Sequence, residues 1–186
     1  DLVGVSLSSK IGKACYIPIG HKSIKCIEKD LVLKKLKPLL EDPSIKKIGQ
    51  NIKFDFIVFF KHGINMTSME DTMLMSYVLD AGKNRHNMDT LSEIHLNHKT
   101  ISFKDLVGTG KKEINFSEVD VEKAKDYAAE DADITFRLYK KFQKSLKDEK
   151  MINIYEIFEK PLLKILAYME IEGVKIDNKF LKSLST

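Results

Sequence analysis

The period of the hydrophobic pattern changes along the chain, and this change limits the fold more than any other feature. Residues 2–7 and 14–19 alternate as β-strands do, with a glycine-containing turn between them. Over residues 30–40 the leucines recur at three- and four-residue spacing, which is typical of an amphipathic helix. A β-hairpin followed by helical segments predicts an α/β domain.

The rest of the chain continues this order with one short strand and several helices. We expect a strand at 45–49, helices at 53–62, 71–79 and 88–96, a loop over 97–116, a long helix from about 117 to 146, and a helix over 152–172 kinked at Pro161. The order ββαβ followed by helices predicts a mixed sheet with flanking helices and a helical C-terminal part. The charged stretch 144–150 lacks apolar periodicity and predicts a boundary between residues 1–147 and 151–186.

Composition excludes several classes of protein. The chain has 186 residues, of which 43% are hydrophobic and 31% charged, as in an ordinary globular domain. Its longest apolar run, Phe56–Phe60, is far shorter than the roughly 20 residues of a membrane span, so we expect no membrane partner. The net charge of +4 permits a polyanionic partner without requiring one. Two cysteines without metal-ligand spacing fit a reducing cytosol, and the missing initiator Met suggests a piece of a longer protein.

One acidic residue falls where the long helix is expected to be apolar. The apolar stripe of that helix runs from Ala124 to Phe142, and Asp131 lies within it, one turn after Tyr127 on the same face. A carboxylate there costs on the order of several kcal/mol unless something neutralises it. Two interpretations remain open at this point. Asp131 is either a structural residue satisfied by a buried donor, or a metal ligand with a tyrosine beside it.

A second acidic residue follows a buried strand directly. In the segment Gly49–Asp55 the strand runs straight into a helix, and Asp55 falls in the first helical turn. Open α/β sheets place their ligand sites at this end of the strands. The alternative interpretation is an aspartate that complements the helix dipole.

Taken together, the two segments resemble a known family. Gly49–Asp55 (Gly-Gln-Asn-Ile-Lys-Phe-Asp) and Tyr127–Asp133 (Tyr-Ala-Ala-Glu-Asp-Ala-Asp) are similar to the second and third motifs of DEDD-type 3′→5′ exonucleases, in the subclass that carries a tyrosine. The resemblance extends through Glu70–Leu74 and Arg85–Leu91, covers nearly the whole chain, and is to the proofreading domain of the bacterial DNA polymerase I family. Glu159–Asp177 resembles the start of the polymerase domain in that family.

The resemblance implies an RNase H-like exonuclease fold and hydrolysis of terminal phosphodiesters. Such enzymes use two divalent cations about 3.5–4 Å apart, Mg²⁺ or Mn²⁺, held by carboxylates. It implies that Asp55 and Asp131 bind the metals and that Tyr127 orients the attacking water. The implied partners are the single-stranded 3′ end of DNA and the remainder of a polymerase chain, in replication and repair in a bacterial cytoplasm. The residues implied along the DNA path are Gln50, Asn51, Phe54, Arg85, Met88 and Phe103. For Phe54, Met88 and Phe103, packing in the hydrophobic core is an equally good interpretation as contact with DNA.

One part of the family pattern is missing from this sequence. The first motif of the family is Asp-x-Glu on a strand before the hairpin, whereas the only Asp-x-Glu here, Asp120–Glu122, begins the long helix. We therefore expect an exonuclease fold without its first strand, and a chain that is inactive alone. Two alternatives stay open. One is a degenerate, non-catalytic domain that positions DNA or the polymerase, and the other is a free-standing RNA-trimming nuclease, against which residues 152–186 argue.

Overall fold

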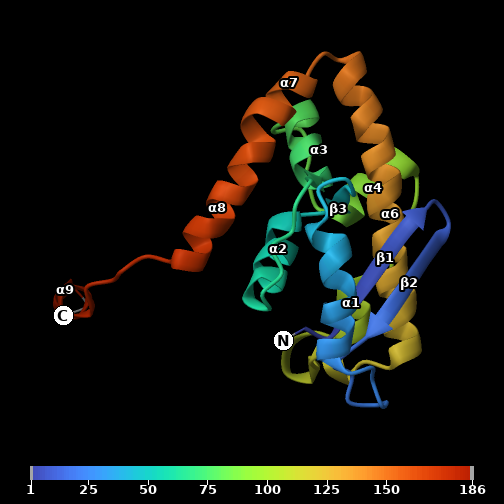
Figure 1. The fold of residues 1–186 in the computed structure, drawn as a ribbon, viewed down its shortest axis with the longest axis vertical. Helices are drawn as coiled ribbons and strands as arrows, with labels where there is room; N and C mark the ends of the chain where they lie inside the picture. The colour runs from blue at the N-terminus through green and yellow to red at the C-terminus, as the bar shows by residue number, and fades with distance from the viewer. Residues whose placement is uncertain (1, 185–186) are drawn as a thin grey trace.

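The computed structural model describes residues 2–184, apart from the side chain of Lys111. Its strands are β1 (Gly4–Lys10), β2 (Lys13–Pro18), β3 (Lys47–Gly49) and β4 (Met69–Asp71). The helices up to the long one are α1 (Lys29–Glu41), α2 (Ile52–Lys61), α3 (Thr72–Asp80), α4 (Met88–Leu96), α5 (Phe103–Val107) and α6 (Val121–Asp148). The C-terminal part comprises α7 (Ile152–Ile154), a π-helical turn (Tyr155–Glu159), α8 (Lys160–Glu172) and α9 (Asn178–Leu184). Figure 1 shows α6 passing behind the hairpin up to α7, where the chain turns back through α8.

The four strands form two separate two-stranded sheets, whereas the sequence predicts a single mixed sheet. β1 and β2 pair antiparallel, with Val5 opposite Ile17, and β3 pairs in parallel with β4. Both sheets lie against α6. Within residues 2–184, one edge of β1 and one edge of β3 have no strand partner. The α/β class is as predicted, but no strand among the described residues joins the two sheets.

Helix α6 has clear sequence reasons for its start and for its orientation. The Asp120 side chain accepts hydrogen bonds from the backbone N–H groups of Glu122 (3.1 Å) and Lys123 (3.3 Å), which caps the helix. The predicted stripe from Ala124 to Phe142 is the buried face. The helix continues through part of the charged stretch to Asp148 because Leu146 is also fully buried.

The structure adds detail to two expectations for the less regular segments. The stretch 97–116 is not only a loop, because it contains α5 and a 3₁₀ turn. At the position of the expected kink, a π-helical turn lies just before Pro161, which is in the first turn of α8. Prolines and π-helical turns are both common causes of helix kinks.

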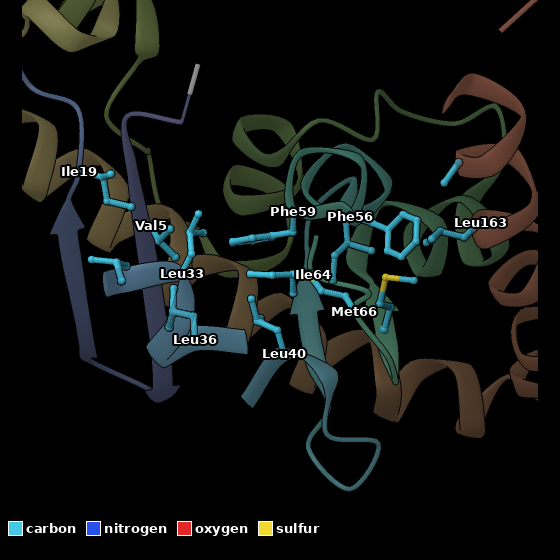
Figure 2. Close-up of a cluster of buried hydrophobic side chains, with 14 residues drawn as sticks. Val5, Ile19, Leu33, Leu36, Leu40, Phe56, Phe59, Ile64, Met66 and Leu163 are labelled. Carbon is cyan, nitrogen blue, oxygen red and sulfur yellow. The ribbon is translucent and has the colours of Figure 1, made fainter. Parts of the chain in front are cut away.

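The C-terminal segment packs into the cores that the preceding elements form. One buried cluster joins β1, α1 and α2 to Leu163 and Ala167 of α8. Figure 2 shows Phe56 of α2 and Leu163 of α8 facing one another in this cluster. A second cluster joins α3, α4 and α6 to Tyr155. Residues after 150 therefore help to hold the elements that border the groove described next.

Candidate active site

A groove of about 1790 Å³ lies between the two sheets. It is bordered by residues 2–9 of the hairpin, residues 45–50 around β3, the start of α2 and one face of α6. The three residues expected to be catalytic, Asp55, Tyr127 and Asp131, all line it, although they belong to motifs far apart in the sequence. The fold thus brings both acidic motifs to one recess.

Asp55 is placed by an abrupt turn from β3 into α2. Asn51 adopts a left-handed backbone (φ 57°, ψ 47°), a conformation that Asn tolerates better than most residues. The Asp71 carboxylate accepts hydrogen bonds from the backbone N–H groups of Asn51 (3.1 Å) and Ile52 (2.9 Å). Asp55 follows in the first turn of α2, as the sequence predicts, and lines the groove.

Asp131 lies half-buried on the groove face of α6. Its Oδ1 atom is buried and has no hydrogen-bond partner among the described residues. A purely structural aspartate would have both oxygens satisfied, because an unpaired buried acceptor is costly. The unsatisfied oxygen therefore favours the metal-ligand interpretation, since a cation would supply the missing partner.

The electrostatics of the groove disfavour negative charge when no cation is present. Burial raises the pKa of Asp131 from 3.8 to about 7, against a hydrogen bond from Tyr127 that favours the ionised form. Burial, with the nearby Asp71, also raises the pKa of Asp55 to about 7. Asp55 is exposed to solvent whereas Asp131 is half-buried, so water screens the Asp55 charge more strongly. Burial and the Asp131 charge raise the pKa of Tyr127, which keeps its hydroxyl protonated.

Replacing Asp131 by Asn should stabilise the metal-free chain at pH 8. A folded-state pKa of about 7 against an ordinary value of 3.8 means that the ionised carboxylate opposes folding. This penalty is absent below about pH 4, grows as the pH rises and is complete above about pH 7. Discounting for the water that reaches the side chain, we expect a gain of about 1–2 kcal/mol, or about 2–8 °C in Tm. Circular dichroism melts at pH 5 and pH 8 measure this difference, which should be smaller at pH 5.

The matched control for this change is Asp126→Asn, an exposed aspartate on the same helix. Its effect should stay within about 0.5 kcal/mol at both pH values. Added Mn²⁺ should raise the Tm of the unchanged chain more than that of Asp131→Asn. An Asp131→Asn protein that melts no higher than the unchanged chain at pH 8 would contradict the prediction.

Four of the six residues expected to contact DNA line the groove, and two do not. Gln50, Phe54, Met88 and Phe103 line it, whereas Asn51 and Arg85 are absent from its walls. The Gln50 amide is already engaged, since it donates to the His86 carbonyl (2.7 Å) and accepts from the Thr72 hydroxyl. In this structure the Gln50 side chain therefore links the β3–α2 turn to Thr72 and His86.

The aromatic residues of the groove differ in how well they fit a core. Phe54 is 65% exposed and Phe103 is 46% exposed, so neither is an ordinary core residue. Met88 is half-buried, and its sulfur accepts a hydrogen bond from the Thr135 hydroxyl (3.5 Å). Sequence reasoning missed Phe116, which stacks on Phe103 (ring centroids 5.8 Å apart) and contacts Tyr127 (6.1 Å). Its signal was an aromatic residue just before the helix that carries Tyr127.

Comparison with known proteins places the chain in a family. A model of a 3′-5′ exonuclease family matches residues 1–147. The chain belongs to this exonuclease family. Among curated relatives, the exonuclease chain is 41% identical over 206 residues to DNA polymerase I of Rhizobium leguminosarum, covering 100% of this chain and 20% of that protein. It is 39% identical over 188 residues to DNA polymerase I of Pseudomonas aeruginosa, covering 97% and 21%. The chain therefore spans about a fifth of the length of these relatives.

Solved structures support the fold. A nuclease in its apo form aligns to the exonuclease chain with a TM-score of 0.70 at 22% identity, covering 96% of this chain and 84% of that chain. The POL domain of Pol1 from M. smegmatis, in complex with DNA primer-template and dNTP, aligns with a TM-score of 0.70 at 20% identity, covering 93% and 26%. The predicted RNase H-like exonuclease fold is confirmed.

Two further observations limit what the described residues supply. They contain no group of three or more His, Cys, Asp or Glu side chains arranged to hold a metal ion. No helix of residues 2–184 has the length and apolar character to cross a membrane.

Proposed function

We propose that this chain is the 3′→5′ proofreading exonuclease domain of a bacterial DNA polymerase I, acting in DNA replication and repair in the cytoplasm. The observation that carries the proposal is that Asp55 and Asp131 line one groove, with a buried oxygen of Asp131 that has no partner among the described residues. Membership of the exonuclease family and likeness to DNA polymerase I support it. The deciding experiment is the degradation of a 3′-mismatched primer, which should release mononucleotides in the presence of Mg²⁺ and should stop when Asp131 is replaced.

Carboxylate oxygens are the donors that Mg²⁺ and Mn²⁺ prefer, and the unsatisfied Asp131 oxygen fits such a cation. Asp55 and Asp131 would hold divalent cations, which would supply charge stabilisation at the scissile phosphate. Tyr127 stays protonated beside Asp131, so its hydroxyl would orient the attacking water. Each of these three residues would touch the cation, the water or the reacting phosphate.

The aromatic wall of the groove suits an unpaired DNA end. Bases without a pairing partner stack on aromatic side chains with little sequence preference. Phe103 is half-exposed and already stacks on Phe116, so its outer face would receive a base. A mismatched 3′ end frays more easily than a paired one, and such a wall would therefore select it.

We also propose that the groove accepts a strand that precedes Asp1 in the longer polypeptide. Every residue from Leu2 to Ser9 lines the groove, whereas the face of a strand would present only every second residue. The groove therefore runs along the backbone edge of β1, and Lys46–Gln50 border it on the β3 side. Unpaired strand edges are templates for a further strand. An inserted strand would join the two sheets and would be the place for the Asp-x-Glu motif.

The division of the chain follows from the same proposal. Residues 1–147 would form the exonuclease domain, and residues 151–186 would begin the polymerase domain. The alternative function is a degenerate domain that binds DNA without cutting it. One observation favours this alternative: the described residues contain no cluster of three side chains that could hold a metal ion.

Replacing Phe103 by Ala should weaken the binding of single-stranded DNA by about 1–3 kcal/mol, because a stacking platform is lost. Fluorescence anisotropy with labelled oligothymidylate in EDTA measures this without cleavage. Phe158→Ala is the matched control, since Phe158 is 66% exposed but lies outside the groove. Equal affinities for Phe103→Ala and Phe158→Ala would show that the aromatic wall does not contact the DNA.

Arg85→Ala should lower the salt slope of DNA binding by about 1, because one phosphate contact beyond the groove would be lost. The same anisotropy measurement at several salt concentrations gives this slope.

A further inference from the structure

Asp71, the last residue of β4, is fully buried and joins two helix starts. Its Oδ1 accepts hydrogen bonds from Asn51 N–H (3.1 Å), Met73 N–H (2.8 Å) and Leu74 N–H (3.4 Å). Its Oδ2 accepts from Ile52 N–H (2.9 Å). One carboxylate therefore caps both α2 and α3, and charge-assisted bonds of this kind are stronger than neutral ones.

The turn held by Asp71 sets the direction of α2. Asn51 has a left-handed backbone, a conformation that Asn tolerates, and this conformation turns the chain sharply from β3 into α2. Both N–H groups of this turn, at Asn51 and Ile52, point to the Asp71 carboxylate. Asp55 lies one helical turn further on, so a change at Asp71 would swing Asp55 within the groove.

Asp71 is in turn held by a tyrosine from beyond the matched family segment. Tyr155 is fully buried, and its hydroxyl accepts from the Asp71 backbone N–H (3.0 Å) while donating to Glu70 Oε2 (3.0 Å). Glu70 is itself buried, and its charge is balanced by Lys160 (2.8 Å) and Lys46 (3.4 Å). The Tyr155 hydroxyl thus links the C-terminal segment to the backbone of β4.

The π-helical turn explains how two residues of one segment reach the same carboxylate. Tyr155 and Lys160 are five positions apart, and in an α-helix such residues point about 140° away from each other. The i→i+5 hydrogen bonding of the π-helical turn at Tyr155–Glu159 brings them to one side, where both contact Glu70. π-Helical turns occur often at functional sites, and here the turn serves the connection to β4.

The C-terminal segment also contacts α2 directly. Lys53 of α2 forms an ion pair with Glu170 of α8. The rings of Phe56 and Tyr168 meet edge to face, with centroids 5.7 Å apart. Helix α2 is therefore fixed along its length by α8 and at its start by Asp71, whose backbone N–H in turn donates to Tyr155.

We propose that Asp71 is a positioning residue for the Asp55 half of the site, and that Tyr155 holds Asp71 in place. Neither residue needs to touch the cation or the DNA. The consequence for catalysis rests on the proposed function, whereas the consequence for the β3–α2 turn does not. In this proposal, the segment after residue 150 helps to set the position of Asp55, because Tyr155 contacts Asp71 and Asp71 holds the β3–α2 turn.

Hydrogen-exchange mass spectrometry of the full-length polypeptide tests the structural half of this proposal. In Asp71→Asn, exchange in peptides covering residues 50–56 should become about 10-fold faster or more, because charge-assisted bonds to Asn51 and Ile52 are weakened. Tyr155→Phe, which removes one oxygen atom, should speed the same peptides by a smaller factor. Tyr168→Phe is the matched control on the same segment. It keeps the ring that contacts Phe56 and removes only a hydroxyl for which no hydrogen bond is found among the described residues, so these peptides should be unchanged.

Enzyme kinetics test the catalytic half. For Asp71→Asn we expect exonuclease kcat to fall about 10-fold or more and the Mn²⁺ concentration for half-maximal rate to rise by a similar factor. The KM for DNA, and the affinity for single-stranded DNA in EDTA, should stay within about 2-fold. A merely structural lesion would lower the folded fraction and weaken DNA binding as well.

Unchanged exchange over residues 50–56 in both variants would overturn the proposal, whatever the nuclease activity. Faster exchange with unchanged kcat and Mn²⁺ dependence, in an active protein, would also overturn it. If the unchanged protein has no nuclease activity, the proposed function fails, and exchange alone decides the role of Asp71. If Asp71→Asn does not fold, Tyr155→Phe carries both measurements.

Discussion

Asp131→Ala in the full-length polypeptide should abolish Mg²⁺-dependent 3′→5′ degradation, lowering the rate by about 1000-fold or more. The residue offers a buried oxygen that has no partner within residues 2–184, and its removal would leave the cation without its ligand on α6. Asp55→Ala should have a similar effect, because it removes the ligand on α2. The assay follows the release of mononucleotides from a 3′-mismatched primer.

Asp126→Ala is the matched control, an exposed carboxylate on the same helix that does not line the groove. It should retain the activity of the unchanged protein. Single-stranded DNA binding in EDTA shows that each variant is folded and competent to bind. An unchanged full-length protein that is folded and binds DNA but releases no mononucleotides would establish the non-catalytic scaffold instead.

Residues 1–186 alone should degrade the same primer at least about 100-fold more slowly than a chain extended upstream of Asp1. Two carboxylates would leave the metal charge under-compensated, and a misplacement of about 1 Å costs on the order of 100-fold in rate. An extension of about 10–20 residues is enough for a strand and its connection. It should also raise Tm, since it would pair the open edges of β1 and β3.

A proline in the middle of the added strand is the control for this experiment, because it removes a ladder N–H without shortening the chain. That variant should lose both the activity and the gain in Tm. Asp131→Ala in the extended chain should abolish the activity again. Equal rates for the short and extended chains would mean that the groove does not take a strand.

Short-range patterns were sufficient for most elements of the fold. Helix α6 begins at its capping Asp120 and keeps the predicted apolar stripe buried, because side-chain spacing along a helix is a local property. The strand β4 was missed. It has only three residues, two of them acidic, and both acidic side chains are buried. Their burial is tolerated because Tyr155, Lys160 and the helix starts supply partners from distant parts of the chain.

By itself, the sequence singled out two carboxylates as candidates for the site: Asp131 stands in an apolar stripe, and Asp55 follows a strand directly. Only the tertiary structure decided that both line one groove, that an oxygen of Asp131 finds no donor in the described part of the chain, and that Phe116 joins Tyr127 there. Periodicity records which face of an element is apolar, but not which elements cover that face. Burial, hydrogen-bond satisfaction and pKa depend on atoms brought together from remote positions, and so they arise only when the chain is packed.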